Sequence, residues 1–286
     1  MELIAGLRWF LTPWELVPLV QFVIWGALGL YIAGSWRGAR PGVWRTLAFV
    51  TGLAGFYAVT QTGLDYYAQY LFYAHRGQHL VLHHLAPFLV ALAAPAPVLA
   101  AGLPRSWRAR WQAWRVHSAV AWLAVPYRCL QHPVVAGLLF VGLIYLWLIP
   151  SVHFDAMLSA DLYWLMNTSM AVDGLLFWWL IFARGDGRLT PNLSFGKRVA
   201  LLVAIVPPQI LAGATMVFSE RNLFDVYSVC GRAFPISPMT DQQLGGLLTW
   251  IPPSMMSVIA VLVLLAMRFH ELGGEAARHP RPAEVA

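Results

Sequence analysis

Four histidines lie close together in one short stretch of the chain. His75, His79 and His83 are each separated by four positions, and His84 follows directly. If the stretch is helical, this spacing places three imidazole rings along one side, with about 40° of drift per step. Imidazole is the commonest metal-binding side chain, and stacked histidines can bind copper, zinc, iron or haem. We therefore predict a metal site with His75, His79 and His83 as ligands; the alternative is that these rings bond to one another and to water.

Other reactive side chains lie far from this stretch in the sequence. Cys230 offers a soft thiolate that favours Cu(I), and the competing interpretation is a small buried apolar residue. Asp173 lies within an apolar segment, where a carboxylate is costly without a partner or a function. We expect Cys230 to be a further metal ligand, with Asp173, His84 and Asp241 as partners of the site. Asp173 could instead relay protons or join two helices, and Asp241 could cap a helix.

The sequence lacks the motifs of several common catalytic sites. It contains no Walker-type phosphate loop, no Cys-x-x-Cys pair and no G-x-S-x-G nucleophile elbow. Acyl transfer, phosphoryl transfer and thiol exchange therefore have no support in the sequence, and we expect a protein that is not an enzyme.

The composition is typical of an integral membrane protein. Of the 286 residues, 59% are hydrophobic and 11% are charged, whereas soluble domains carry about 25% charged residues. The formal net charge of +6 does not indicate nucleic-acid binding, because the basic residues lie in short loops between apolar segments. We expect an all-α bundle of membrane helices that forms a single domain over residues 1–286 within the lipid bilayer.

The apolar segments are long enough for about seven membrane-spanning helices. The expected spans are Glu15–Ala33, Arg45–Thr62, Gln78–Leu103, Pro133–Val152, Leu162–Ala183, Lys197–Ser219 and Leu244–Met267. The segment Trp107–Leu130 alternates arginine with tryptophan near its start, which is typical of a helix that lies on the membrane surface. It could instead form an eighth span, broken at Pro126, which would move the later loops to the other side.

The basic residues predict the orientation of the bundle. With seven spans, all but four of the 19 arginines and lysines fall on one side; the exceptions are Arg8, Arg76, Arg221 and Arg232. By the positive-inside rule, the N-terminus is then outside, and the C-terminus with its polar tail over residues 268–286 is cytoplasmic. This orientation places the histidine stretch, His153 and Cys230 near the outer face. Cys129 falls on the inner face, which excludes a disulfide between the two cysteines.

The histidine stretch also resembles the pattern of a known family. Residues 75–87 are similar to H-M-x-Q-H-x-x-L-x-x-x-A-P-P, a pattern of the seven-span cytochrome c oxidase assembly factors of the CtaG, caa-type kind. Residues 131–135 resemble the start of the family's fourth span, 174–179 its G-L-L-F-W block, and 241–250 its D-Q-x-x-G-G-x-x-x-W block. The four blocks occur in the family's order, and the resemblance extends over about residues 70–267.

The resemblance implies a role in the maturation of haem–copper oxidases through copper supply, with His75 and His79 as the paired histidines. The chain departs from the family at several places that bear on a metal site. Arg76 replaces a methionine, Leu148 stands where a histidine often follows tryptophan, and Asn167 stands about where another histidine is common.

A metal site copied from typical members of the family would therefore lose ligands in this chain. Two explanations remain open at the level of the sequence. Either this branch does not bind metal as other members do, or other side chains substitute, namely His83, His84, Asp173 or Cys230.

The leading hypothesis is a multi-pass protein of the bacterial cytoplasmic (inner) membrane that assists the assembly of a haem–copper cytochrome c oxidase. It would hold or pass copper near the outer face, with the oxidase subunits and a periplasmic or other extracytoplasmic copper chaperone as partners. One alternative is a haem-binding redox protein. Another is a copper or proton transporter that uses Asp173 and the proline-broken spans.

Overall fold

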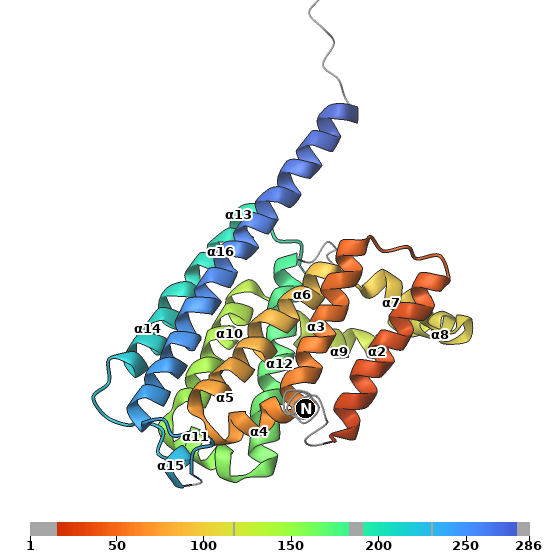
Figure 1. Ribbon diagram of the computed structural model, residues 1–286. Helices are drawn as coiled ribbons and strands as arrows, with labels where there is room; N and C mark the ends of the chain where they lie inside the picture. The colour runs from red at the N-terminus through yellow and green to blue at the C-terminus, as the bar shows by residue number, and fades with distance from the viewer. Residues whose placement is uncertain (1–15, 117, 183–190, 230, 279–286) are drawn as a thin grey trace, which may run out of the picture.

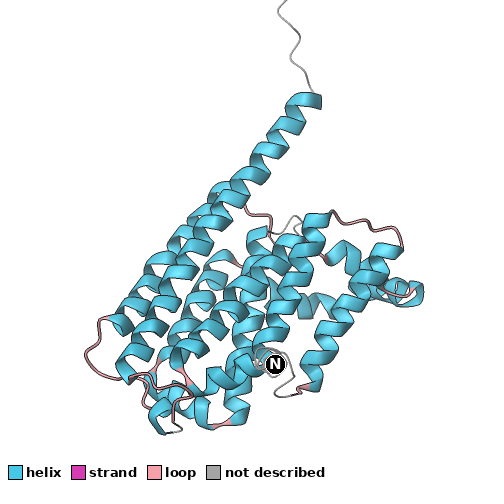
Figure 2. Cartoon of the chain, viewed as in Figure 1, coloured by secondary structure: helices cyan, strands magenta, loops and turns pink. Residues whose placement is uncertain are grey.

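The computed structural model describes residues 16–116, 118–182, 191–229 and 231–278. In these ranges the regular secondary structure is helical throughout, with no strand (Figure 2). The helices, in chain order, are α2 (Pro18–Trp36), α3 (Val43–Gln61), α4 (Gly63–Tyr70), α5 (Phe72–His79), the π-helix η1 (Leu80–Leu85), α6 (Ala86–Ala93), α7 (Ala96–Gly102), α8 (Arg105–Val116), α9 (Ser118–Leu130), α10 (Pro133–Leu148), α11 (Pro150–Leu158), α12 (Ala160–Phe182), α13 (Phe195–Ala204), α14 (Val206–Val217), α15 (Val226–Val229) and α16 (Pro238–Arg278).

Among the described residues, five helical segments are long and apolar enough to cross a membrane. They are α2, α3, α12, the α13–α14 segment Phe195–Val217, and α16 from Pro238 to Gly273. Two pairs of helices reach this length together but bend: Phe72–Ala93 with Ala96–Gly102 by 70°, and Ala124–Leu130 with Pro133–Leu148 by 71°. Counting each bent pair as one span gives seven spans in the described ranges, which confirms the expected all-α polytopic bundle.

The burial of the side chains distinguishes helices in the middle of the bundle from helices at its edge. In lipid every backbone polar group must be satisfied within the protein, so long apolar segments fold as helices. At the edge of the bundle, α2 leaves Phe22 77% exposed and Leu19 56% exposed, on a surface that hydrocarbon chains would cover. Helix α12 buries Phe177 and Trp178 fully. It accordingly lies in the middle of the bundle, with α2 at its rim (Figure 1).

Glycines allow α14 and α16 to pack closely. Helices α14 and α16 run side by side along one edge of the bundle (Figure 1). A Cβ atom added at Gly213 would collide with the backbone of Gly246, and one at Gly246 would collide with Gly213. The glycines that open the expected seventh span therefore serve helix packing, as small residues commonly do in membrane bundles.

The third span starts and ends earlier than we expected. We predicted a helix over Gln78–Leu103, whereas the helix starts at Phe72 and breaks at Ala94. Ala94 has a left-handed backbone conformation with φ of 48°, and Pro95 disfavours the helical conformation in the residue before it. The chain then turns by 70° into α7, which packs against α2.

The fourth span also ends earlier than the predicted range Pro133–Val152. Helix α10 stops at Leu148, Ile149 has extended backbone angles, and Pro150 begins α11. Proline is well suited to the first turn of a helix, where its missing N–H costs nothing.

The segment Trp107–Leu130, for which the sequence allowed a surface helix or an eighth span, falls in the short helices α8 and α9. Neither is long enough to cross a membrane by itself, and no eighth span occurs among the described helices. Helix α16 extends to Arg278, so the described part of the expected cytoplasmic tail, residues 268–278, is helical.

The two ends of the bundle differ in the helices that lie there. Helices α4, α11 and α15 cover one end, and the last turns of α16 project beyond the other (Figure 1). The first end carries the loops that the sequence predicts to lie outside, and we call it the outer end. The loop with Arg37 and Arg40 lies at the opposite end.

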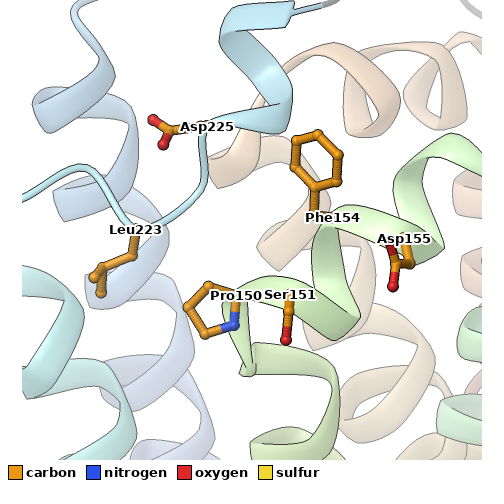
Figure 3. Close-up of a pocket in the computed structure, with 6 residues that line it drawn as sticks. All are labelled: Pro150, Ser151, Phe154, Asp155, Leu223 and Asp225. Carbon is orange, nitrogen blue, oxygen red and sulfur yellow. The ribbon is translucent and has the colours of Figure 1, made fainter.

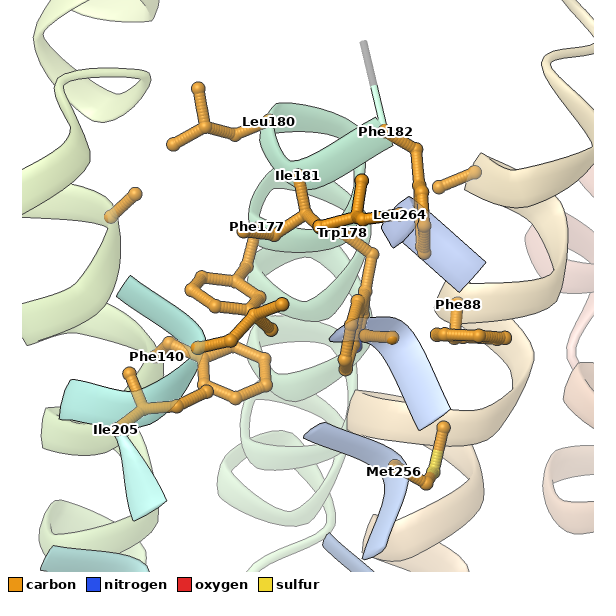
Figure 4. Packing of buried hydrophobic residues seen from close by; sticks show 14 of the residues in the cluster. Phe88, Phe140, Phe177, Trp178, Leu180, Ile181, Phe182, Ile205, Met256 and Leu264 are labelled. Atoms are coloured by element: carbon orange, nitrogen blue, oxygen red, sulfur yellow. The ribbon is translucent and has the colours of Figure 1, made fainter. Parts of the chain in front are cut away.

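The main apolar cluster, drawn in Figure 4, includes Phe88 and Ala91 of α6, the helix that follows the histidine stretch. The rings of Phe140 and Phe177 stack with centroids 3.9 Å apart, and Trp178 meets Phe88 edge-on at 5.0 Å. Phe140 also stacks on the ring of His83 at 4.0 Å. This cluster therefore forms an aromatic floor beneath the buried histidines.

Candidate functional site

Asp241 fixes the start of the helix that carries the histidines. Its Oδ2 accepts the backbone N–H of Phe72 at 3.1 Å, and its Oδ1 accepts that of Tyr73 at 2.9 Å. Arg232 donates from Nε to Oδ2 at 3.2 Å. A carboxylate placed in this way satisfies N–H groups that have no partner within the helix, and it interacts favourably with the helix dipole. Asp241 therefore caps α5, a helix distant in the sequence, and positions the histidine helix.

The helix changes its winding between the histidines. In an α-helix, Pro87 would have no N–H to donate to the carbonyl of His83, and its ring would crowd that carbonyl. The wider winding of η1, in which Ala86 N–H reaches the carbonyl of Val81, relieves this conflict. As a result the predicted column of three imidazoles divides, and His83 faces a different environment from the first two.

Three buried imidazoles meet toward the outer end. The ring centroids of His75 and His79 are 4.3 Å apart, and those of His75 and His153 are 5.1 Å apart. Each of these side chains is at most 2% exposed. We call His75, His79 and His153 the outer histidine cluster. His153 was not predicted as a site residue, because it follows a different span; its predicted position at the outer face was the only signal in the sequence.

His75 is the least restrained member of the outer histidine cluster. Both of its ring nitrogens are buried, and neither has a hydrogen-bond partner in the described part of the chain. Leaving a buried polar group without a partner costs about 1–3 kcal/mol. Such a group in a native structure calls for an explanation, and a bound ligand is one.

His79 is held between a cation and an amide. Its Nε2–H donates to Oδ1 of Asn167 at 3.1 Å, and its Nδ1 accepts from Nη1 of Arg76 at 3.2 Å. Arg76 also donates from Nε to the hydroxyl of Thr249 at 3.0 Å. Arg76 is 4% exposed, and no described carboxylate forms a salt bridge with it. Two departures from the family pattern, Arg76 and Asn167, thus contact the same imidazole.

His153 is locked into one tautomer by its neighbours. Its Nδ1–H donates to the backbone carbonyl of Trp147 at 3.0 Å, and its Nε2 accepts from the hydroxyl of Tyr227 at 3.0 Å. Burial, reinforced by the charge of Arg76, lowers the pKa of His153 to about 3. The ring is therefore neutral at physiological pH, the form in which imidazole binds metals.

The other two histidines of the stretch, His83 and His84, form a second group deeper in the bundle. His83 donates from Nε2 to Oδ2 of Asp173 at 3.0 Å, and its ring centroid is 4.8 Å from that of His84. Nδ1 of His83 and both ring nitrogens of His84 are buried without a hydrogen-bond partner among the described residues. We call His83 and His84 the inner histidine pair. Gly174 lets α12 come this close, because a Cβ there would collide with the backbone of His83.

A buried network of hydrogen bonds, which was not predicted from the sequence, holds α5 in place. Gln78 donates from Nε2 to Oδ1 of Asp65 at 2.7 Å, and the hydroxyl of Tyr163 donates to the same oxygen at 2.8 Å. Asp65 is 5% exposed. The glutamine between the paired histidines of the family pattern therefore joins α5 to α4 and α12, a role that no local spacing reveals.

The cavities near the histidines are small. One of about 10 Å³, lined by Arg76, His79, His84, Met170 and Thr249 among others, lies between the outer histidine cluster and the inner histidine pair. It has room for about one water-sized occupant.

A larger pocket, of about 370 Å³, opens at the surface near the start of α11. Figure 3 shows its lining, which contains none of the histidines: Pro150, Ser151, Phe154, Asp155, Leu223 and Asp225.

The described residues include no group of three or more His, Cys, Asp or Glu side chains already arranged to hold a metal ion. The free nitrogens of His75 fit a ligand role. His79 fits it less well as it stands, because Arg76 occupies the lone pair on its Nδ1. Cys230, the predicted soft ligand, lies outside the described residues.

The fold and the site together define the class. This is a polytopic helical membrane protein in which five histidines of the described ranges are buried, with His83 packed on an aromatic floor. The chain belongs to the family of cytochrome c oxidase caa3 assembly factors, whose model matches residues 29–270.

Similar curated proteins come from mycobacteria. An uncharacterized protein of Mycobacterium leprae is 26% identical to this chain, over 96% of this chain and 42% of its own length. Uncharacterized proteins of Mycobacterium bovis and Mycobacterium tuberculosis are each 27% identical, over 94% of this chain and 42% of theirs. The chain thus spans less than half the length of these relatives. No solved structure matches it.

Proposed function

We propose that this protein is a non-catalytic assembly factor for a haem–copper oxidase, and that it holds copper in the outer histidine cluster before the metal is passed on. Membership of the caa3 assembly factor family supports the assembly role. The single observation that carries the copper role is His75, whose two buried ring nitrogens have no partner among the described residues while two other imidazoles lie beside it.

The hydrogen bonds around the cluster suggest an order of binding. His75 can accept copper without breaking any described hydrogen bond. His79 can follow once Arg76 releases its Nδ1, and His153 can follow once the hydroxyl of Tyr227 releases its Nε2. Because Thr249 also anchors Arg76, the guanidinium has an alternative partner to retain when it leaves His79. His75 is therefore the primary ligand in this proposal.

The remaining predicted ligands keep different roles. Cys230 stays a predicted soft ligand. His83 is engaged with Asp173 and belongs to the inner histidine pair.

The proposed location is the bacterial cytoplasmic membrane, with the cluster toward the outside. The distribution of basic residues supports this orientation. The proposed partners are the oxidase subunits that receive copper and an extracytoplasmic copper chaperone that delivers it. A chaperone that arrives from outside would meet the outer end first.

Haem is the less favoured ligand. A macrocycle needs a cavity of several hundred Å³, whereas the cavity lined by His79 and His84 has about 10 Å³. A purified protein with an intense Soret band would reverse this preference.

The copper proposal is tested by loading the purified full-length chain with Cu(I) under anaerobic conditions. Copper content is compared between the wild type, His75→Ala/His79→Ala, and His132→Ala as a control that removes an exposed imidazole outside both groups. We expect the double variant to bind less copper than the wild type and the control to bind as much as the wild type. Equal copper in all three proteins would contradict the ligand assignment. Oxidase activity in a deletion strain tests the assembly role separately, and undiminished activity would contradict it.

A further inference from the structure

His83 is oriented as a metal-binding histidine usually is. Its Nε2–H donates to Oδ2 of Asp173 at 3.0 Å, so the lone pair on its Nδ1 remains available. That nitrogen is buried and has no partner among the described residues. Histidines that bind metals almost always donate their other N–H to a carboxylate, a carbonyl or water, which fixes the ring and increases its basicity. Asp173 has this position relative to His83.

His84 supplies further donors beside His83, and Met170 lies on the same small cavity as His84. His84 is 4% exposed, its ring lies 4.8 Å from that of His83, and neither of its nitrogens has a described partner. Met170 is 1% exposed and lines the cavity of about 10 Å³ together with His84. The thioether is a soft ligand that selects Cu(I) over harder ions.

The spacing on α12 explains why these groups meet. Asn167, Met170 and Asp173 lie three residues apart, so they share one face of the helix. Asn167 binds His79, Asp173 binds His83, and Met170 borders the cavity between these two contacts. Helix α12 thus supplies hydrogen-bond partners to two histidines of the stretch, His79 and His83.

We infer that His83, His84 and Met170 form a second, deeper Cu(I) site, in which Asp173 orients His83 and balances the charge of the ion. A monovalent ion with two neutral imidazoles, a thioether and one nearby carboxylate leaves no net charge on the group. Structural Zn²⁺ sites take four ligands, and this set offers three. The aromatic floor under His83 closes the site toward the cytoplasmic end.

Arg76 separates this site from the outer histidine cluster. It bonds to Nδ1 of His79 on one side and lines the cavity with His84 on the other. Copper that moves from the outer cluster to the inner site must therefore pass a fixed positive charge, which keeps the two ions in separate sites. The inference deepens the proposed function and rests on it for the identity of the metal.

The test measures Cu(I) stoichiometry of the purified full-length chain by competition with a chromophoric chelator. We expect about two ions for the wild type and about one for Met170→Leu or His84→Gln. Met170→Leu conserves volume and is well tolerated in packed cores, and His84→Gln breaks no described hydrogen bond. Met216→Leu, a buried methionine in another cluster, is the matched control and should keep both ions.

The copper-edge X-ray absorption spectrum adds a ligand-specific readout. His75→Ala/His79→Ala should retain one ion with a sulfur neighbour, and adding Met170→Leu should abolish the sulfur signal. If Met170→Leu and His84→Gln keep both ions and the sulfur signal persists, the inner site is overturned. If they each lose one ion while His75→Ala/His79→Ala loses none, the inner site stands and the outer assignment fails. A wild type that binds one ion, lost in His75→Ala/His79→Ala, overturns the inner site alone.

Discussion

Arg76 sets the electrostatics of the outer histidine cluster at the scale of single residues. Its guanidinium lies 3.2 Å from Nδ1 of His79 and has no described carboxylate to neutralise it. A buried charge without a counter-ion is costly, and it opposes any second cation nearby. Copper binding at His79 therefore has to overcome both the lost hydrogen bond and this repulsion.

Removing this charge should strengthen copper binding. We expect Arg76→Gln to raise the affinity of the chain for Cu(I) by about tenfold, equivalent to about 1.4 kcal/mol. The measurement is a chelator competition titration. Arg221→Gln removes the same charge from an exposed arginine at the outer end and should leave the affinity unchanged. Weaker binding by Arg76→Gln would mean that the guanidinium assists the site instead of competing with the ion.

His153 should make stability depend on pH. Burial lowers its pKa to about 3, whereas the value in an unfolded chain is about 6.5. The unfolded state then binds more protons between these values, so the stabilisation is complete above about pH 6.5 and is lost as the pH falls toward 3. Each pH unit in this window costs up to about 1.4 kcal/mol.

The measurement is the midpoint of thermal unfolding in detergent between pH 4 and 7.5. The wild type should lose stability below about pH 6.5, and His153→Gln should lose less over the same range. Parallel curves for the two proteins would show that the protonation of His153 does not contribute.

At the scale of elements, the π-helix decides which groups the histidines meet. Pro87 favours the wider winding of η1, and this winding turns His83 and His84 toward α12 and Phe140. Asp241 holds the other end of the same helix by accepting the first N–H groups of α5. The histidine helix is thus fixed at its start by a cap and in its middle by a change of winding.

The close packing of α12 on η1 predicts a sensitive glycine. In Gly174→Ala the new Cβ would overlap the backbone of His83, which cannot move as a flexible side chain could. We expect a loss of about 1–3 kcal/mol in stability, together with weaker copper binding at the inner histidine pair.

Gly142→Ala is the matched control, because the space beside Gly142 is open. It should leave stability unchanged or raise it by up to about 1 kcal/mol, the difference in helix propensity. Thermal unfolding in detergent measures both. Equal stability of the two variants would show that η1 can shift away from α12 at little cost.

At the scale of the whole molecule, the buried histidines and the largest described apolar cluster occupy different parts of the bundle. The buried histidines lie between the outer end and the aromatic floor, and the apolar cluster fills the space beyond. In the proposed function, copper reaches these histidines from the outer end. The proposed copper role therefore depends on which way the bundle is inserted.

The orientation can be tested with single cysteines in a background in which both native cysteines are replaced. Asp155→Cys at the outer end should react with a membrane-impermeant maleimide in intact spheroplasts. Arg37→Cys, in the loop at the other end, should react only after the membrane is permeabilised. The opposite labelling pattern would place the histidines near the cytoplasm and would remove the basis for delivery from outside.

The sequence alone determined the class of protein and the order of its spans. Long apolar segments force helices because lipid cannot satisfy a backbone, so the bundle follows from composition. The pairing of His75 with His79 was also predictable, because four residues make about one helical turn. The predicted copper and its ligands stay predictions.

Only the tertiary structure decided what each buried group meets. His153 joins His75 because α11 packs near α5, Asn167 reaches His79 across the bundle, and His83 separates from the ladder to bind Asp173. Local spacing carries no information about these contacts, because they join helices far apart in the chain. A buried donor or acceptor without a hydrogen-bond partner costs free energy. Such atoms therefore mark a candidate ligand site, whereas buried polar atoms that have partners do not.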